Sequence, residues 1–127
     1  MMIADSDVLI DSLRGREPMK SRIALEIRTG QLATTVINLF ELLSGARTDA
    51  ERAKVQKLVS ALSIVPLDEA ASREAARVRR VLESRGQSIG MADSLIAGIC
   101  LSNDGMLLTR NRAHFERVEG LALSSER

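Results

Sequence analysis

Short apolar runs alternate along the chain with longer segments in which apolar residues return every three or four positions. The short runs predict buried strands, and the longer segments predict helices that turn one face toward a core. The predicted strands are residues 2–4, 32–35, 63–68, 106–109 and, at an edge, 121–123. The predicted helices are residues 5–14, 17–28, 36–46, 50–62, 69–84 and 89–101, followed by a loop or short helix at 110–115.

This alternation predicts an α/β fold, a three-layer α/β/α sandwich around a central parallel sheet of about four or five strands. No linker, repeat or low-complexity stretch interrupts the pattern, so we expect one domain over residues 1–127. Ligands of such sheets bind beyond the carboxyl ends of the strands. The end of the first predicted strand, at Asp5, is therefore the first place to look for chemistry.

The composition indicates which class of protein this is, but it says little about which molecules the protein binds. Of the residues, 45% are hydrophobic and 28% are charged, and no apolar stretch approaches the roughly 18 residues that span a bilayer. No signal-peptide pattern is present, and the single cysteine, Cys100, lies in an apolar run, so we expect a cytoplasmic protein with no membrane partner. Without Trp or Tyr, we expect no base-stacking platform for single-stranded nucleic acid, so any nucleic acid would be contacted at its phosphates.

Three carboxylates occupy unusual positions. Asp5 follows a buried strand, Glu41 lies inside an apolar helical run, and Asp93 is the only charge between Ile89 and Leu101. Taken singly, Asp93 is also an ordinary acid for the first turn of a helix, and Glu41 fits the exposed side of an amphipathic helix. Together they indicate a carboxylate cluster, because charged side chains are seldom buried without a partner or a metal.

Clustered carboxylates suit the hydrolysis of a phosphodiester bond. This reaction needs an activated water and the shielding of negative charge in the transition state, and bound Mg²⁺ supplies both. Mg²⁺ prefers oxygen ligands and keeps several waters. Without the metal, mutual repulsion would raise the pKa of at least one acid, and binding of the ion would relieve it.

In five stretches the chain resembles the PIN-domain proteins, and more narrowly the VapC-type toxin ribonucleases of bacterial toxin–antitoxin pairs. The resemblance runs in order through almost the whole chain, and only the combination of stretches is specific. The matching stretches are residues 3–11 (IADSDVLID), 35–42 (TVINLFEL), 89–97 (IGMADSLIA), 107–115 (LLTRNRAHF) and 118–121 (VEGL).

The resemblance implies an endoribonuclease that depends on Mg²⁺, with Mn²⁺ as a substitute. It assigns the metal-binding and catalytic acids to Asp5, Glu41 and Asp93, with Asp5 and Asp93 as the most direct ligands. Glu41 would bind a second ion or orient the attacking water. A fourth acid of the family falls on Asn111, which is neutral and would hold a second metal poorly. Asp7 would partly restore the missing charge, or it caps the following helix.

Other residues near the acids have auxiliary roles by the same resemblance. Ser6 and Thr109 match small hydroxyl positions beside the cluster. Arg110 and Arg112 flank the pocket and are either contacts for RNA phosphates or solvated side chains. For His114, the only histidine, we expect a surface role in preference to general-base catalysis. A further set of acids is expected to be helix caps or turn residues: Asp11, Asp68 and Asp104.

The resemblance also implies partners. These are an RNA substrate, a cognate VapB-like antitoxin, and a second copy of the chain in a homodimer. The antitoxin would place a helix in a groove of the toxin and a basic side chain among the acids. Promoter DNA would be bound only through the antitoxin. The predicted helices at 36–43 and 50–62 offer contact surface for a partner, although ordinary core explains them as well.

Other function classes fit less well. A receiver-like phospho-acceptor domain needs a lysine after a late strand, and no lysine follows Lys57. A nucleotide-binding fold needs a glycine-rich loop after the first strand, which is absent here. A catalytically weak PIN fold that binds RNA or protein is the main alternative. The presence of Asp5, Glu41 and Asp93 together favours the nuclease.

Overall fold

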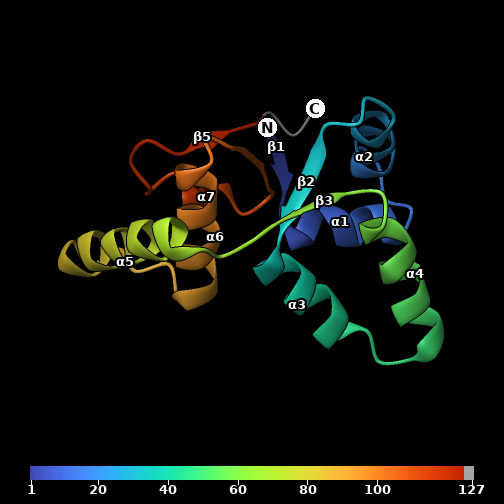
Figure 1. Ribbon diagram of the computed structural model, residues 1–127, viewed down its shortest axis with the longest axis horizontal. Helices are drawn as coiled ribbons and strands as arrows, with labels where there is room; N and C mark the ends of the chain where they lie inside the picture. The colour runs from blue at the N-terminus through green and yellow to red at the C-terminus, as the bar shows by residue number, and fades with distance from the viewer. Residues whose placement is uncertain (125–127) are drawn as a thin grey trace.

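The computed structural model describes residues 1–124, which contain one five-stranded sheet. Every pair of neighbouring strands is parallel, and the strand order is β3-β2-β1-β4-β5. The strands are β1 (Met2–Ala4), β2 (Leu32–Thr35), β3 (Ser63–Val65), β4 (Met106–Leu108) and β5 (Ala122–Leu123). The first strand of the chain therefore lies in the middle of the sheet, between β2 and β4 (Figure 1).

Helices lie on both faces of the sheet, which confirms the predicted three-layer sandwich (Figure 1). Helices α5, α6 and α7 cover one face, and α1, α2 and α4 cover the other, while α3 extends from the carboxyl end of β2. The helices are α1 (Ser6–Leu13), α2 (Met19–Arg28), α3 (Val36–Gly45), α4 (Asp49–Val59), α5 (Glu69–Ser84), α6 (Met91–Ser102) and α7 (Arg112–Phe115). No helix in the described residues is long and apolar enough to cross a membrane.

Alternate residues of the central strands feed two separate cores. Ile3 of β1 and Leu107 of β4 pack with α5, α6 and Phe115, whereas the next residues, Ala4 and Leu108, pack with α1, α2 and α4. This division follows from the strand geometry, because successive side chains point to opposite faces of a sheet. Strands buried on both faces have no polar face, which explains why they appear in the sequence as short continuous apolar runs.

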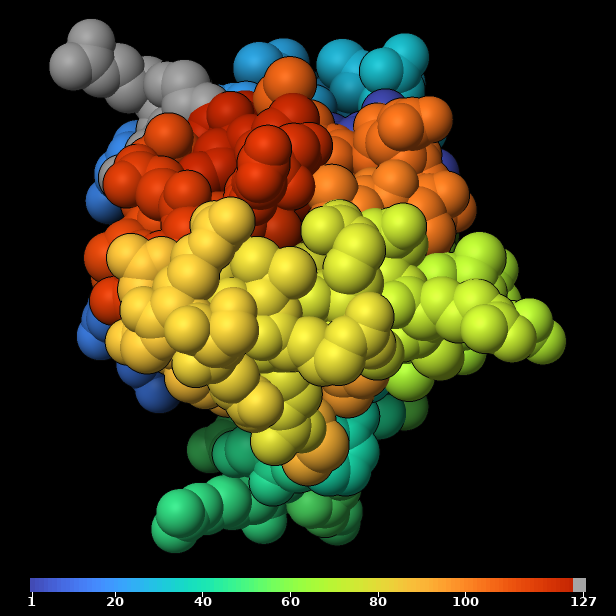
Figure 2. Space-filling view, turned by 90° about the vertical axis from the view of Figure 1, so that its left-hand side faces the viewer, coloured from blue at the N-terminus to red at the C-terminus, as the bar shows by residue number. Residues whose placement is uncertain are grey.

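The contact between α5 and α6 is unusually close. A Cβ added to Gly98 of α6 would lie 2.6 Å from the carbonyl oxygen of Ala71 and 2.6 Å from the Cβ of Ala75, both on α5. Glycine and alanine at this crossing let the two backbones approach one another. The outer side of α5, drawn in yellow in Figure 2, is exposed and carries charged residues that include Arg77.

Several element boundaries differ from those predicted. The last helix of the core begins at Met91 and not at Ile89, because Gly90 has a φ of +89° and forms the N-cap. Helix α4 ends at Val59, where Ser60 begins a turn in place of the predicted last helical residues. Strand β3 ends at Val65, just before Pro66, which lacks the N–H needed to continue a ladder.

Candidate active site

The carboxyl ends of β1, β2 and β4 converge on one polar cluster. Asp5 follows β1, Thr35 is the last residue of β2, and Thr109 follows β4. The Asp5 backbone N–H donates to the carbonyl oxygen of Leu108 (2.9 Å), which continues the pairing of the two strands to the edge. The sheet topology therefore brings together side chains that are about a hundred residues apart in sequence, as the ligand-site rule for parallel sheets predicts.

Asp5 is buried and fully engaged by hydrogen bonds. Its side chain is the N-cap of α1: Oδ1 accepts from the Ser6 backbone N–H (2.8 Å) and from Asn38 Nδ2 (2.9 Å). Oδ2 accepts from the Thr109 hydroxyl (2.7 Å). Burial raises the pKa of this carboxyl and the charge of Asp93 adds to the rise, although the hydrogen bonds to Thr109, Ser6 and Asn38 oppose it.

Asn38, which the sequence analysis missed, joins the acids to one another. It is fully buried at the start of α3, where it forms a capping box with Thr35. Its Nδ2 group donates to Asp5, to the Ser6 hydroxyl (2.9 Å) and, at 3.5 Å, to Glu41. The signal in the sequence is a threonine followed three residues later by a polar residue in an otherwise apolar run, which is a variant of the capping-box pattern.

Glu41 lies one turn beyond Asn38 on α3 and is exposed. Its Oε1 accepts a hydrogen bond from the Ser6 hydroxyl (2.9 Å), so Ser6 contacts both Asn38 and Glu41. Partial burial raises the pKa of Glu41, and the charges of Asp5 and Asp93 raise it further, although the Ser6 hydrogen bond lowers it. The exposed position suggested by the amphipathic pattern is thus correct, and the carboxylate also lies within the electrostatic reach of the other acids.

Asp93 lies in the first turn of α6, as the helix-start pattern indicated, and it also belongs to the cluster. Its Oδ2 accepts from Asn111 Nδ2 (3.2 Å) and lies 2.9 Å from Nδ1 of His114. His114 is partly at the surface, with 41% of its side chain exposed, and its Nδ1 also contacts this carboxylate, so the expected surface role stays a prediction. The spacing of Asn111 and His114 on the start of α7 directs both toward Asp93.

Asp7 lies beside Asp5 and does not cap α1, since Asp5 occupies the N-cap position. Asp7 Oδ2 accepts from the Arg110 backbone N–H (3.0 Å), which ties α1 to the segment after β4. Its Oδ1 is buried and has no hydrogen-bond partner among the described residues. Burial, together with the charge of Asp5, raises the pKa of Asp7 to about 6.

The two arginines after β4 bind partners within the chain. Arg110 Nε lies 3.0 Å from Asp11, and Arg112 donates to the carbonyl oxygen of Ser124 (2.7 Å). The prediction that Asp11 is a cap or turn residue is therefore wrong. Asp11 is a buried ion-pair partner within α1. Asp68 does cap α5, and Asp104 does lie in a turn, with a φ of +51°.

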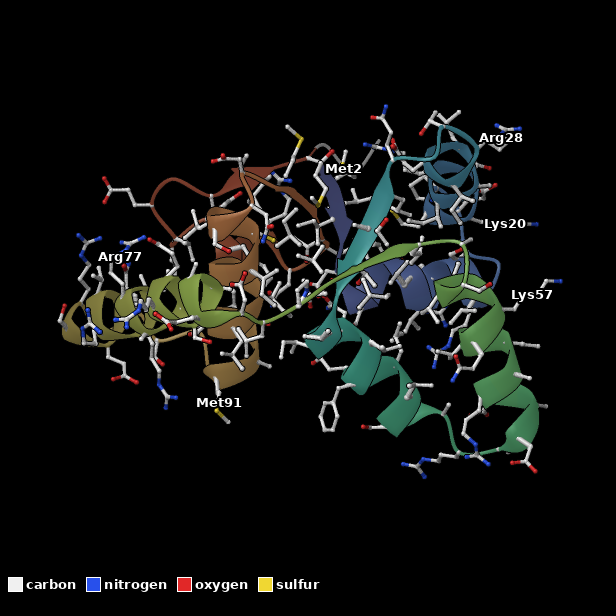
Figure 3. All side chains as sticks on the ribbon, viewed as in Figure 1. Met2, Lys20, Arg28, Lys57, Arg77 and Met91 are labelled. Atoms are coloured by element: carbon white, nitrogen blue, oxygen red, sulfur yellow. The ribbon has the colours of Figure 1, made fainter. Side chains whose placement is uncertain are left out.

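The acids form a negative centre without compensation by lysine or arginine. Within residues 1–124, the ion pairs include none from a lysine or arginine to Asp5, Glu41 or Asp93. Figure 3 shows Lys20, Arg28 and Lys57 projecting outward from α2 and α4. Carboxylates whose neighbouring charges raise the pKa of Asp5 and of Glu41 are a set of hard oxygen donors suited to a divalent cation.

The arrangement does not form a closed protein cage for a metal. In the described part of the chain, no group of three His, Cys, Asp or Glu side chains is placed to hold a metal ion. Mg²⁺ does not require such a cage, because proteins commonly hold it through one or two carboxylates while it keeps several waters. Asp5 and Asp93 can supply that number of ligands.

Comparison with known proteins agrees with the fold. The family model described as "PIN domain" matches residues 2–121. Ribonuclease VapC10 of Mycobacterium tuberculosis is 36% identical over 121 residues, which cover 95% of this chain and 90% of that protein. The tRNA(fMet)-specific endonuclease VapC of Shigella flexneri is 27% identical over 121 residues, covering 92% of this chain and 91% of that protein.

A solved structure shows the same architecture over the full length. A chain of the DNA-bound VapBC complex from Salmonella typhimurium superposes with a TM-score of 0.87 and 25% sequence identity, covering 100% of both chains. A family model that spans nearly the whole chain, together with a relative above 30% identity, establishes the relationship. The chain belongs to the PIN-domain family, and within that family to the VapC-type ribonucleases.

Proposed function

We propose that this protein is a Mg²⁺-dependent endoribonuclease and the toxin of a toxin–antitoxin pair. The observation that carries the proposal is the convergence of Asp5, Glu41 and Asp93, from three different elements, on one uncompensated negative centre. The names of the relatives support the class of reaction, since they are called ribonucleases and an endonuclease. PIN-domain nucleases are metal-dependent as a family, and the oxygen donor set here favours Mg²⁺, with Mn²⁺ as a substitute.

The residues divide into metal ligands and groups that hold those ligands. Asp5 and Asp93 hold the cation, and Glu41, which is more exposed, orients the attacking water or binds a second ion. When bound, Mg²⁺ activates water and shields charge on the phosphoryl group. Thr109 fixes Asp5 through its hydroxyl, and Ser6 fixes Glu41 in the same way, so each acid keeps one orientation before substrate arrives.

An apolar groove beside the acids fits the proposed antitoxin. The groove has a volume of about 290 Å³ and lies between α1, α3 and α4. Leu13, Leu42 and Val55 line it, and Glu41 stands where the groove meets the acid cluster. An amphipathic helix of a VapB-like antitoxin would bury its apolar face here and place a basic side chain among the acids. Promoter DNA would then be bound through the antitoxin.

Exposed apolar residues support the proposed homodimer. Phe40 on α3 is 69% exposed and Met91 at the start of α6 is 63% exposed. The two helices pack against each other, and Figure 3 shows Met91 at the free end of α6. Large exposed apolar side chains favour contact with another chain.

The nuclease function is tested with purified protein and a structured RNA. We expect cleavage with Mg²⁺ or Mn²⁺, none with EDTA, and a loss of roughly 10³-fold in Asp5→Asn, since removal of a metal ligand forfeits several kcal/mol of transition-state stabilisation. Glu83→Gln, which alters an exposed ion pair on α5, is the matched control and should cleave like the wild type. Undiminished cleavage by Asp5→Asn would contradict the metal-ligand role of Asp5, whereas no cleavage by the wild type with either metal would leave only a binding role.

The toxin role is tested in cells. Induction should arrest growth, and the Asp5→Asn variant expressed to the same level should not. Co-expression of a small DNA-binding protein encoded beside the toxin should relieve the arrest. Growth that continues at high expression of active enzyme would contradict the toxin role while leaving the nuclease intact.

A further inference from the structure

One group at the edge of the acid cluster has no part in the function proposed so far. His114 Nδ1 lies 2.9 Å from Oδ2 of Asp93 and 3.1 Å from Nδ2 of Asn111. Asn111 Nδ2 is itself 3.2 Å from the same carboxylate oxygen. Both side chains therefore contact Oδ2 of Asp93, and neither contacts the other carboxylate oxygen of Asp93, Oδ1.

The position of the proton on His114 follows from this contact. An ionised carboxylate accepts hydrogen bonds and cannot donate them, so the 2.9 Å contact places the proton on Nδ1. The 3.1 Å contact between Nδ1 and Asn111 Nδ2 is then not a hydrogen bond but the approach of two donors to the same carboxylate oxygen. The neighbouring residue anchors the helix, because Phe115 of α7 is fully buried in the core. His114 thus approaches Asp93 from a short helix that is anchored to the sheet.

We infer that His114 is a positioning residue that, together with Asn111, holds the carboxylate of Asp93 in one orientation. This inference rests on the proposed function, in which Asp93 is a metal ligand. Asp93 lies in the first turn of α6 with its side chain 21% exposed, and among residues 1–124 its hydrogen-bonded side-chain partners are these two. Fixing Oδ2 would stop the carboxylate from rotating and would leave Oδ1 free of these two donors for a cation. Partners of this kind commonly change metal affinity or activity by 10- to 100-fold.

The arrangement also explains how Asn111 is accommodated in the cluster. An acid at this position would face Asp93 directly and add another negative charge. Asn111 and His114 instead donate hydrogen bonds to Asp93, so they restrain it without adding repulsion. The imidazole and the amide together replace one acidic side chain by two hydrogen-bond donors.

The tautomer of His114 gives a direct test in the metal-free protein. His114 is the only histidine in the chain, so its ring nitrogens are assigned without ambiguity by long-range ¹H–¹⁵N NMR of untagged protein at pH 8. We expect a proton on Nδ1 in the wild type and a shift toward Nε2 protonation in Asp93→Ala. An Nδ1 without a proton in the wild type would overturn the inference.

Two substitutions separate positioning from a role of the other ring nitrogen. An asparagine at 114 places its amide nitrogen near the position of Nδ1, whereas a glutamine places it near Nε2. We expect Mg²⁺ affinity, measured by calorimetry, to fall about 10-fold or more in His114→Ala and His114→Gln and to recover in His114→Asn. Glu83→Gln serves as the control. Recovery by glutamine alone, or equal affinity in all variants, would overturn the inference.

These readouts separate failure of the inference from failure of the proposed function. If wild-type protein neither binds Mg²⁺ nor cleaves RNA, the proposed function fails, and the positioning of a metal ligand fails with it. If the wild type binds and cleaves but the His114 variants show no graded change at equal thermal stability, only the inference fails.

Discussion

The acid cluster and the α5–α6 crossing are both places where elements come very close, but for opposite reasons. At the crossing, Gly98, Ala71 and Ala75 remove side-chain bulk, so that backbones meet through apolar contact. At the cluster, Asp5 and Asp93 bring like charges together in a partly buried position, which raises the pKa of Asp5. The close packing of α5 and α6 stabilises the fold, whereas the close approach of the acids destabilises it.

The difference teaches how substitutions should be interpreted in this protein. A neutral replacement in the acid cluster removes activity and leaves stability equal or higher. A larger side chain at the α5–α6 crossing removes stability and affects activity only through the folded fraction. Measuring cleavage and the free energy of unfolding for the same variants therefore tells the two regions apart.

The largest effect is expected for Asp93→Asn. The amide keeps the shape of the side chain but loses the charge, so RNA cleavage in Mg²⁺ should fall roughly 10³-fold. Because one negative charge leaves the cluster, the free energy of unfolding in EDTA should change by less than about 1 kcal/mol. Urea unfolding and a cleavage time course measure the two quantities. A large loss of stability would place Asp93 among the structural residues.

Gly98→Ala should have the next largest effect, on stability alone. The added methyl group meets the backbone of Ala71 and Ala75, and overpacking of this kind costs about 2–3 kcal/mol. Gly45→Ala is the matched control, since Gly45 is also helical and nothing lies within 4 Å of an added Cβ. That control should be stabilised by about 0.5–1 kcal/mol. Equal stability of the two variants would mean that α5 and α6 separate easily.

Asp7→Asn should stabilise the metal-free protein in a pH-dependent way. The pKa of Asp7 is about 6 in the folded protein, against an ordinary value of 3.8, so the unfolded chain loses this proton first. Wild-type stability therefore falls as pH rises from about 4 to 6 and stays lower above that range. Asparagine has no such proton, so the variant should gain about 1–2 kcal/mol at pH 8 and nothing below about pH 4. Urea unfolding in EDTA at both pH values checks the sign.

The smallest effect is expected for Arg110→Gln. The substitution breaks the ion pair with buried Asp11, in which the arginine is half exposed, so the loss should be about 0.5–1 kcal/mol. The same variant tests the predicted RNA contact, because loss of a phosphate contact raises KM and leaves kcat unchanged. An unchanged KM would assign Arg110 to the fold alone.

Much of the fold was predictable because its signals are local. Alternating apolar runs predicted all five strands and the layers, and Asp68 was correctly expected to cap a helix or lie in a turn. The boundaries at Gly90 and Ser60 were missed because they depend on backbone conformation, which apolar spacing does not encode. The strand order depends on how crossovers pack, so the sequence pattern left it open.

The acids of the candidate site could be picked out from the sequence, but the residues that hydrogen-bond to them could not. An acid inside an apolar run is conspicuous, so Asp5, Glu41 and Asp93 stood out. Asn38 and His114 are ordinary residues for the interior and the surface of a helix, and their roles depend on a neighbour from another element. Asp11 was misassigned for the same reason, since its partner Arg110 is distant in sequence.

The central place of β1 also has a consequence for synthesis. Strand β4, which pairs with one side of β1, is made about a hundred residues after it. The bond from Thr109 to Asp5 spans 104 positions, so it forms only after β4 has been made. A nascent chain that ends before β4 therefore lacks one side of the sheet and the hydroxyl that orients Asp5.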